Sequence, residues 1–171
     1  MRRVVASMQA EAKKAGVRIV TGDTKVVERG SADQVFVTTS GVGVIPAQRH
    51  LAADTIEPGA VAIVNGVLGY HGAATLAARG DMALSTDIQS DCQSLNGLIE
   101  AVLNAAPNTR AARDATRGGV ASCLNEMAEA AGVSIEIDET SLPLRAEVRG
   151  VCELLGLDPL YLANEGTLVI F

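Results

Sequence analysis

The heptapeptide RDATRGG places a carboxylate, a hydroxyl, a guanidinium and two glycines directly before a run with helical spacing. In a structural interpretation, Asp114 or Thr116 caps the helix. The glycines Gly118 and Gly119 then allow tight packing. In a functional interpretation, Asp114 ligates a divalent cation, while Arg117 and the N–H groups of the helix N-terminus hold phosphate. Each glycine in the first turn costs about 1 kcal/mol relative to alanine, which close approach of a ligand would explain. The motif alone leaves both interpretations open.

A second acidic and basic pair occurs in the sequence TGDTKVV. Asp23 and Lys25 are two residues apart in a segment with strand composition, so a strand would direct both side chains to the same face. They form either an exposed ion pair or a metal carboxylate beside a lysine that neutralises phosphate. The functional interpretation requires the same chemistry elsewhere in the chain, and Asp114 would supply it.

Two further segments carry groups that could transfer protons. The sequence ANEGTLV places Asn164 and Glu165 in a turn that Gly166 closes just before a strand. This segment is either a plain turn or the source of a functional carboxylate. His71, in GYHG, begins a helix of small residues, where a capping or core histidine is commoner than a catalytic one.

Composition narrows the class of function. The chain has 171 residues, a formal net charge of -6, two Phe, two Tyr and no Trp. Negative charge and the scarcity of aromatic stacking groups argue against binding to nucleic acid or to an anionic membrane. No stretch approaches the roughly 20 apolar residues of a membrane span, and the charged N-terminus is unlike a signal peptide. We therefore expect a cytoplasmic protein that acts on small molecules or protein partners.

The cysteines indicate a reducing compartment rather than a metal site. Cys92, Cys123 and Cys152 form an odd set without a CxxC motif, and no His, Cys and Asp spacing suggests zinc. We expect reduced, buried thiols.

Hydrophobic periodicity predicts an α/β chain in which helices alternate with strands. The predicted helices span residues 2–15, 70–80, 91–105, 117–131 and 144–156, and the 91–105 helix begins at Ser90 or Asp91. The predicted strands span residues 17–28, 34–46, 60–64 and 133–138. A last strand begins before Phe171, where the chain end cuts it off, and either a partner or a continuation of this strand is expected to be missing. An exposed strand edge at residues 34–44 predicts self-association.

Several segments in one order resemble the HypE family, the carbamoyl dehydratases of nickel-iron hydrogenase maturation. The segments are VRIVTGDTKVVERG, VFVTTSGVGVIP, SDCQSLNGLIEAVL, RDATRGGVASCLNEMAEAAGVSIEIDE and VRGVCELLGLDPLYLANEGTLVIF. The family belongs to the PurM-like superfamily of ATP-binding proteins. By this resemblance, residues 1–46 end the N-terminal ATP-binding domain. Residues 51–171 form most of the C-terminal domain, with helices packed on a mixed sheet.

The resemblance implies a reaction and its cofactors. In this family ATP phosphorylates the oxygen of a carbamoyl group on the thiol of a C-terminal Cys, and loss of phosphate leaves a thiocyanate that supplies cyanide ligands. The implied cofactors are ATP and Mg²⁺, and the implied partners are a HypF-like carbamoyltransferase and HypC-like and HypD-like assembly proteins. The implied site comprises Asp23 and Asp114 at Mg²⁺, Thr116, Arg117, Gly118 and Gly119 around phosphate, Lys25 near the transferred group, and Glu165 as base.

The chain departs from the family pattern in length and at three positions. Members of the family are longer at both ends, and their last residue is the carrier Cys, so we expect this chain alone not to turn over. Tyr70 stands where Asp is usual, Ala115 where Pro is usual, and Thr167 where Lys is common. A homodimer is left open. Two alternatives also remain: a non-catalytic remnant that binds nucleotide or docks on proteins, and another PurM-like enzyme such as thiamine-phosphate kinase, selenophosphate synthetase or aminoimidazole ribonucleotide synthetase.

Overall fold

The computed structural model of the chain describes residues 1–32, 34–79 and 87–171. It contains two compact units, Met1–Arg49 and His50–Phe171. Assigning residues 1–46 and 51–171 to two domains of the family remains a prediction. In the described ranges, no helix combines the length and the apolar character that crossing a membrane requires.

The described residues of the first unit include the helix α1 (Arg2–Lys14), as predicted. Its half-buried residues are Val4, Met8, Ala12 and Ala15, which share one face because their spacing follows the helical repeat. The strands predicted at 17–28 and 34–46 are wrong, since the described residues of both segments form no strand. Their valines lie in solvent, with Val26 87% and Val44 95% exposed. β-Branched composition favours an extended backbone, but a strand also needs a neighbour for its hydrogen bonds.

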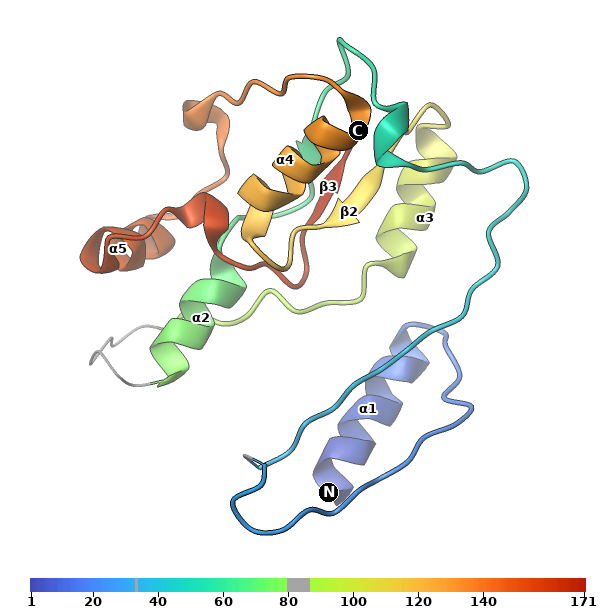
Figure 1. Cartoon of the computed structure of the whole chain (residues 1–171), viewed down its shortest axis with the longest axis vertical. Helices are drawn as coiled ribbons and strands as arrows, with labels where there is room; N and C mark the ends of the chain where they lie inside the picture. Colours follow the sequence, from blue (N-terminus) through green and yellow to red (C-terminus); the bar gives the residue numbers. More distant parts are fainter. Residues whose placement is uncertain (33, 80–86) are drawn as a thin grey trace. The chain divides into compact units, whose positions relative to one another are not determined.

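The second unit is built on a three-stranded sheet of order β1-β3-β2 (Figure 1). The strands are β1 (Ile63–Val64), β2 (Ala112–Asp114) and β3 (Leu168–Ile170). The sheet was predicted to be mixed, but both described ladders are antiparallel, and Val169 faces Val64 on one side and Arg113 on the other. The final strand therefore has partners on both edges, contrary to expectation, and all its residues are buried.

Helix α4 (Gly119–Ala131) covers this sheet, as its apolar repeat predicts. Val120, Leu124 and Met127 are buried in one cluster with Leu68 and Val169. The helix also packs on two short 3₁₀ helices, η1 (Ala53–Thr55) and η3 (Pro159–Tyr161). The segment 133–138, predicted as a strand, packs Val133 and Ile135 on the cluster but forms no ladder among the described residues.

A smaller cluster joins α2 (Tyr70–Arg79) to α5 (Ala146–Leu155). It buries Ala73, Val148, Val151 and Cys152. Both helices were predicted, although α5 begins two residues later than expected and Gly80, the predicted end of α2, lies outside the described residues. A further 3₁₀ helix, η2 (Glu139–Ser141), precedes α5.

All three cysteines are free, but they differ in exposure. Cys123 and Cys152 are buried as predicted, and burial raises the pKa of both thiols, which holds them in the unreactive neutral form. Cys92 is exposed, so the expectation of burial is wrong for this residue. It lies in the segment 87–95, which forms no regular helix or strand.

Helix α3 (Asn96–Ala105) begins later than its sequence predicts. Neither Ser90 nor Asp91 caps it. The carboxylate of Asp91 instead accepts hydrogen bonds from the backbone N–H groups of Glu165 at 3.0 Å and Gly166 at 3.1 Å. A side chain committed to a distant turn cannot cap a helix, so residues 91–95 lie outside the helix that the sequence predicts.

Candidate functional site

Two of the predicted motifs lie side by side in the second unit. The backbone N–H of Ala115 donates to the carbonyl of Thr167 at 3.0 Å, and the N–H of Asn164 donates to the carbonyl of Ala115 at 3.1 Å. The ladder between β2 and β3 continues up to this point, pairing Asp114 with Leu168. The turn that contains Asp114 is therefore bonded directly to the turn that contains Glu165.

Asn164 holds these turns together from inside the protein. Its side chain is almost completely buried, at 1% exposure. The amide oxygen accepts from the N–H of Gly69 at 2.7 Å, and the amide nitrogen donates to the carbonyls of Ala115 and Leu162, both at 3.1 Å. A buried amide with this many partners fixes the relative positions of the segments that it joins.

Glu165 lies beside His71 at the start of α2. Glu165 Oε1 is 3.9 Å from His71 Nε2, and the side chains are 40% and 29% exposed. The other imidazole nitrogen, Nδ1, is 2.8 Å from Ser90 Oγ. An exposed carboxylate next to an imidazole can take up and pass on protons. The sequence interpretation favoured a capping or core role for His71 over a catalytic one. It missed the neighbour Glu165, because the two residues are far apart in the chain.

Asp114 is exposed and is close to Thr116, whose hydroxyl donates to Asp114 Oδ2 at 2.6 Å. Neither residue caps α4, which begins at the left-handed residue Gly118 without a side-chain cap. The capping interpretation of the motif is therefore wrong. No side-chain cap therefore competes with an anion for the positive end of the α4 dipole.

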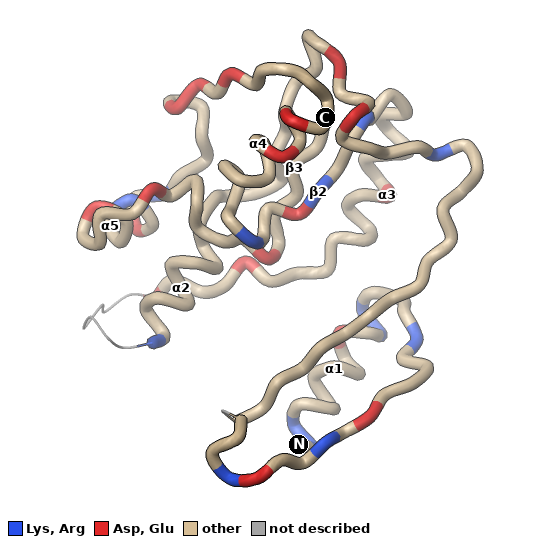
Figure 2. Tube along the Cα trace, in the orientation of Figure 1, with Lys and Arg blue, Asp and Glu red and all other residues tan. Residues whose placement is uncertain are grey.

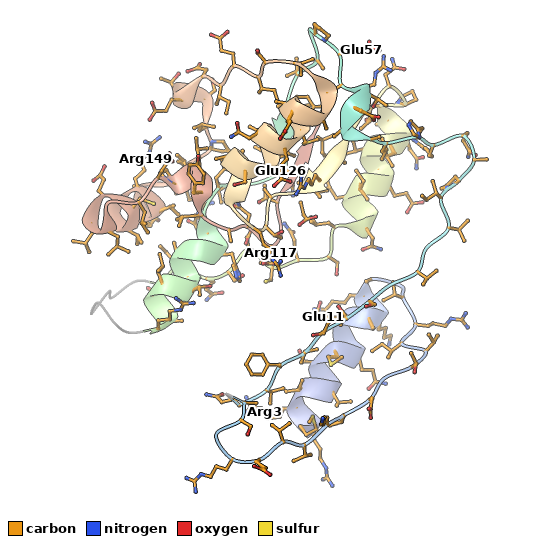
Figure 3. The ribbon with its side chains drawn as sticks, in the orientation of Figure 1. Arg3, Glu11, Glu57, Arg117, Glu126 and Arg149 are labelled. Atoms are coloured by element: carbon orange, nitrogen blue, oxygen red, sulfur yellow. The ribbon has the colours of Figure 1, made fainter. Side chains whose placement is uncertain are left out.

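The two arginines of the motif have different environments. Arg113 forms an ion pair with Glu126, and this hydrogen bond raises the pKa of Arg113. Arg117 has no ion-pair partner among the described residues, and its exposed side chain lies at the turn that precedes α4 (Figure 3). Figure 2 shows acidic residues spread over most segments of this unit, with basic residues between them.

The glycines of the motif have a packing role. A Cβ atom at Gly119 would overlap the carbonyl oxygens of Leu160 and Leu162 in η3 and the residue that follows it, and the φ of Gly119 is +62°. A Cβ at Gly118 would overlap the side chain of Ser122. The close approach at Gly119 is therefore made by the chain itself, and the argument that these glycines serve a ligand loses its basis.

Asp23 and Lys25 belong to the first unit, and the other candidate residues belong to the second. Both side chains are exposed, and Asp23 Oδ1 accepts from the N–H of Thr24 at 2.7 Å. No ion pair joins Asp23 to Lys25 within the described ranges. The expected strand that was to align them is absent there, so their shared role remains a prediction from resemblance.

Sequence reasoning missed three side chains that shape the Glu165 turn. Asp91 was assigned to a helix cap, and Asn65 and Gln93 were not considered. Asn65 Nδ2 and Gln93 Nε2 both donate to the carbonyl of Gly166, at 3.0 and 2.8 Å. Asn65 Oδ1 also accepts from the N–H of Leu168 at 2.6 Å. The signal available in the sequence was a polar side chain in a loop without any other motif. This signal does not identify the partner, which is about 70 to 100 residues away.

Each of the three departures from the family pattern has a local explanation. Arg145 lies over the ring of Tyr70, 5.6 Å from its centre, in a cation–π contact. Ala115 donates its backbone N–H to Thr167, which a proline could not do. Thr167 is buried and donates its hydroxyl to Asp91 Oδ2 at 3.2 Å. These residues are consistent with an ordered site.

The candidate site lies outside the two hollows described in the second unit. Two hollows of about 470 Å³ each lie elsewhere in the second unit, one along η2, α5 and η3 and the other between residues 56–64 and 133–143. Neither is lined by Asp114, Arg117 or Glu165. No group of three or more His, Cys, Asp and Glu side chains suited to a metal occurs in the part of the chain that the structure describes.

The second unit thus packs helices on a small antiparallel sheet, with the Asp114 and Glu165 turns at the same end of β2 and β3. Residues 57–171 match a family described as AIR synthase related protein, C-terminal domain. The match covers more than half of the chain, and the chain belongs to this family. The α/β class is thereby confirmed.

The relatives narrow the likeness to HypE. Over 171 residues, 100% of this chain, it is 67% identical to carbamoyl dehydratase HypE of Rhodobacter capsulatus, with 50% of that protein covered. It is 51% identical over 170 residues to carbamoyl dehydratase HypE of Escherichia coli strain K12, covering 99% of this chain and 50% of that protein. The resemblance to HypE is confirmed. The chain spans about half the length of these curated relatives.

Solved structures agree with this likeness. The crystal structure of Escherichia coli HypE matches with a TM-score of 0.88 and 47% identity, covering 98% of this chain and 52% of that one. A HypE structure in complex with ATP matches at 0.85 and 39%, covering 98% and 50%. A chain of a HypE-HypF complex matches at 0.87 and 38%, covering 99% and 55%. This chain is therefore more similar to HypE than to the other PurM-like enzymes considered above.

Proposed function

We propose that this chain supplies the C-terminal-domain part of an ATP-dependent carbamoyl dehydratase site of the hydrogenase-maturation type. The observation that carries the proposal is the direct bonding of the Asp114 turn to the Glu165 turn through Ala115, Asn164 and Thr167. This arrangement joins a phosphate-binding type of helix N-terminus to a carboxylate with an imidazole neighbour. Similarity to carbamoyl dehydratases over the whole chain supports the same reaction.

The residues present fit a magnesium nucleotide. Arg117 and the positive end of the α4 dipole offer positive charge for phosphate oxygens, and the exposed carboxylate of Asp114 is a suitable Mg²⁺ ligand. Mg²⁺ commonly takes one or two carboxylates and completes its shell with phosphate oxygens and water. One carboxylate in this unit is therefore sufficient, and the role of Asp23 as a Mg²⁺ ligand is proposed from the family resemblance alone. The bound nucleotide supplies a phosphoryl group that converts the carbamoyl oxygen into a good leaving group.

The chain's own groups then have distinct roles. Glu165 is the proposed base that takes a proton from the carbamoyl nitrogen, and its exposure leaves room for a substrate amide. Thr116 holds Asp114 in place through its hydroxyl. Gly118 and Gly119 determine where α4 begins. We propose that they contribute to phosphate binding only by setting the backbone geometry of this helix start. Lys25 is proposed to stabilise charge on the transferred group.

The partners follow from the same resemblance. A HypE chain has been solved with HypF, and we propose a HypF-like carbamoyltransferase as the partner that loads the carbamoyl group. HypC-like and HypD-like acceptors, a homodimer and a cytoplasmic location are proposed on the family likeness.

A chimeric enzyme tests the proposed function. The chain replaces the matching half of Rhodobacter capsulatus HypE, to which it is 67% identical, and the carbamoylated chimera is given ATP and Mg²⁺. We expect ATP-dependent formation of thiocyanate, with the unaltered relative as the positive control. We also expect none from the isolated 171-residue chain. A folded, carbamoylated chimera that forms no thiocyanate would contradict the proposal.

A further inference from the structure

The turn at residues 165–168 is shaped by side chains from other segments. Asp91, Asn65 and Gln93 bond its N–H groups, its Gly166 carbonyl and the Thr167 hydroxyl. Within the described residues the turn itself has no regular helix or strand before Leu168. The position of Glu165 therefore depends on these distant side chains.

Asp91 makes the largest share of these contacts. Its Oδ1 accepts from the N–H of Glu165 at 3.0 Å, and its Oδ2 accepts from the N–H of Gly166 at 3.1 Å and the hydroxyl of Thr167 at 3.2 Å. A Cβ at Gly166 would overlap the carbonyl oxygen of Asp91, so the two backbones are in close contact. An ionised carboxylate is an acceptor at both oxygens, which suits three donors that converge on it.

We propose that Asp91 is the residue that positions Glu165 against His71. This inference rests on the proposed function, in which Glu165 is the base, but it concerns geometry that is measurable without turnover. The neighbours of Asp91 in sequence extend the same arrangement, because Ser90 Oγ contacts His71 Nδ1 at 2.8 Å. The short segment 90–91 thus contacts both the turn of Glu165 and the imidazole of His71. Residues that do not touch the substrate commonly orient a catalytic group by such hydrogen bonds.

Asparagine at position 91 is the suitable variant. It has nearly the same shape, but its amide group presents a donor where the carboxylate presents an acceptor. One of the three donors from Glu165, Gly166 and Thr167 then faces another donor. We expect the turn to loosen while the core of the unit, which does not contain Asp91, stays intact.

The test is a double-variant cycle read by NMR on the 171-residue chain. The chain has two histidines, His50 and His71, so the imidazole signals are readily assigned with a His50→Gln variant. Glu165→Gln removes a charge 3.9 Å from His71 Nε2 and is expected to shift the His71 signals. In the Asp91→Asn background this shift is expected to fall at least about twofold, whereas the Asp87→Asn background, an exposed position in the same segment, retains it.

The outcomes separate the two proposals. A shift that is as large in Asp91→Asn as in the unaltered chain overturns the positioning role. If Asp91→Asn does not fold, as judged by thermal unfolding, Thr167→Val decides instead, because it removes one donor from Asp91 Oδ2, and an undiminished shift there overturns the role. The Glu165→Gln shift of the His71 signals can be lost in the Asp91→Asn background while the chimera with the unaltered chain forms no thiocyanate. That combination would uphold the positioning of Glu165 and reject its function as the base.

Discussion

Glu165→Gln in the Rhodobacter chimera is expected to lower the rate of thiocyanate formation by about 10² to 10⁴-fold, the usual contribution of a general base. Glutamine keeps the size of the side chain and leaves the backbone bonds of the turn to Asp91 in place, but it cannot accept a proton. The rate is measured as thiocyanate released at saturating ATP.

A matched substitution on the same chain serves as the control for Glu165. Glu129→Gln changes an exposed carboxylate in the last turns of α4 and should leave the rate unchanged. The affinity for nucleotide should be similar in both variants, because the groups proposed to bind phosphate are Arg117 and the start of α4, which neither substitution changes. A Glu165→Gln chimera with nearly the unaltered rate would exclude Glu165 as the base.

Gly119→Ala is expected to destabilise the folded chain by about 3 kcal/mol or more. The substitution forces a side chain into a left-handed backbone and against the carbonyl oxygens of Leu160 and Leu162. Neither group can move without separating α4 from η3. The free energy of unfolding is measured by urea denaturation of the 171-residue chain.

Gly97→Ala provides the opposite case. Gly97 is exposed within α3, and a Cβ there meets nothing within 4 Å, so alanine should stabilise the chain by up to about 1 kcal/mol. If Gly119 served only to let a ligand approach, Gly119→Ala would unfold at the same urea concentration as the unaltered chain. That result would contradict the packing role.

The parts of the fold that were predictable depend on local repeats. Val120, Leu124 and Met127 recur at helical spacing, and this spacing places them on the buried face of α4 whatever the rest of the chain does. The segments at 17–28 and 133–138 have strand composition, but a strand depends on a partner that composition does not identify. The prediction there was wrong for that reason.

The sequence identified most residues of the candidate site, but it did not predict the structural role of each. The motif at Asp114 and the turn at Glu165 were both identified, and the structure brings them together through Asn164. The signal at Gly119 was correct, since alanine does not fit, but the cause is a carbonyl of η3 and not a ligand. Asp91 was misread because a carboxylate before a helix usually caps it, whereas here the partner lies 74 residues away.

The central claim is that the Asp114 turn binds the phosphates of a magnesium nucleotide, and calorimetric titration of the 171-residue chain with Mg-ATP tests it most directly. We expect measurable binding that Asp114→Ala weakens by about tenfold or more, equivalent to about 1.4 kcal/mol. Asp54→Ala, at an exposed position in η1, should leave the affinity unchanged. Absence of binding, or equal affinity in the Asp114→Ala and Asp54→Ala variants, would contradict the claim.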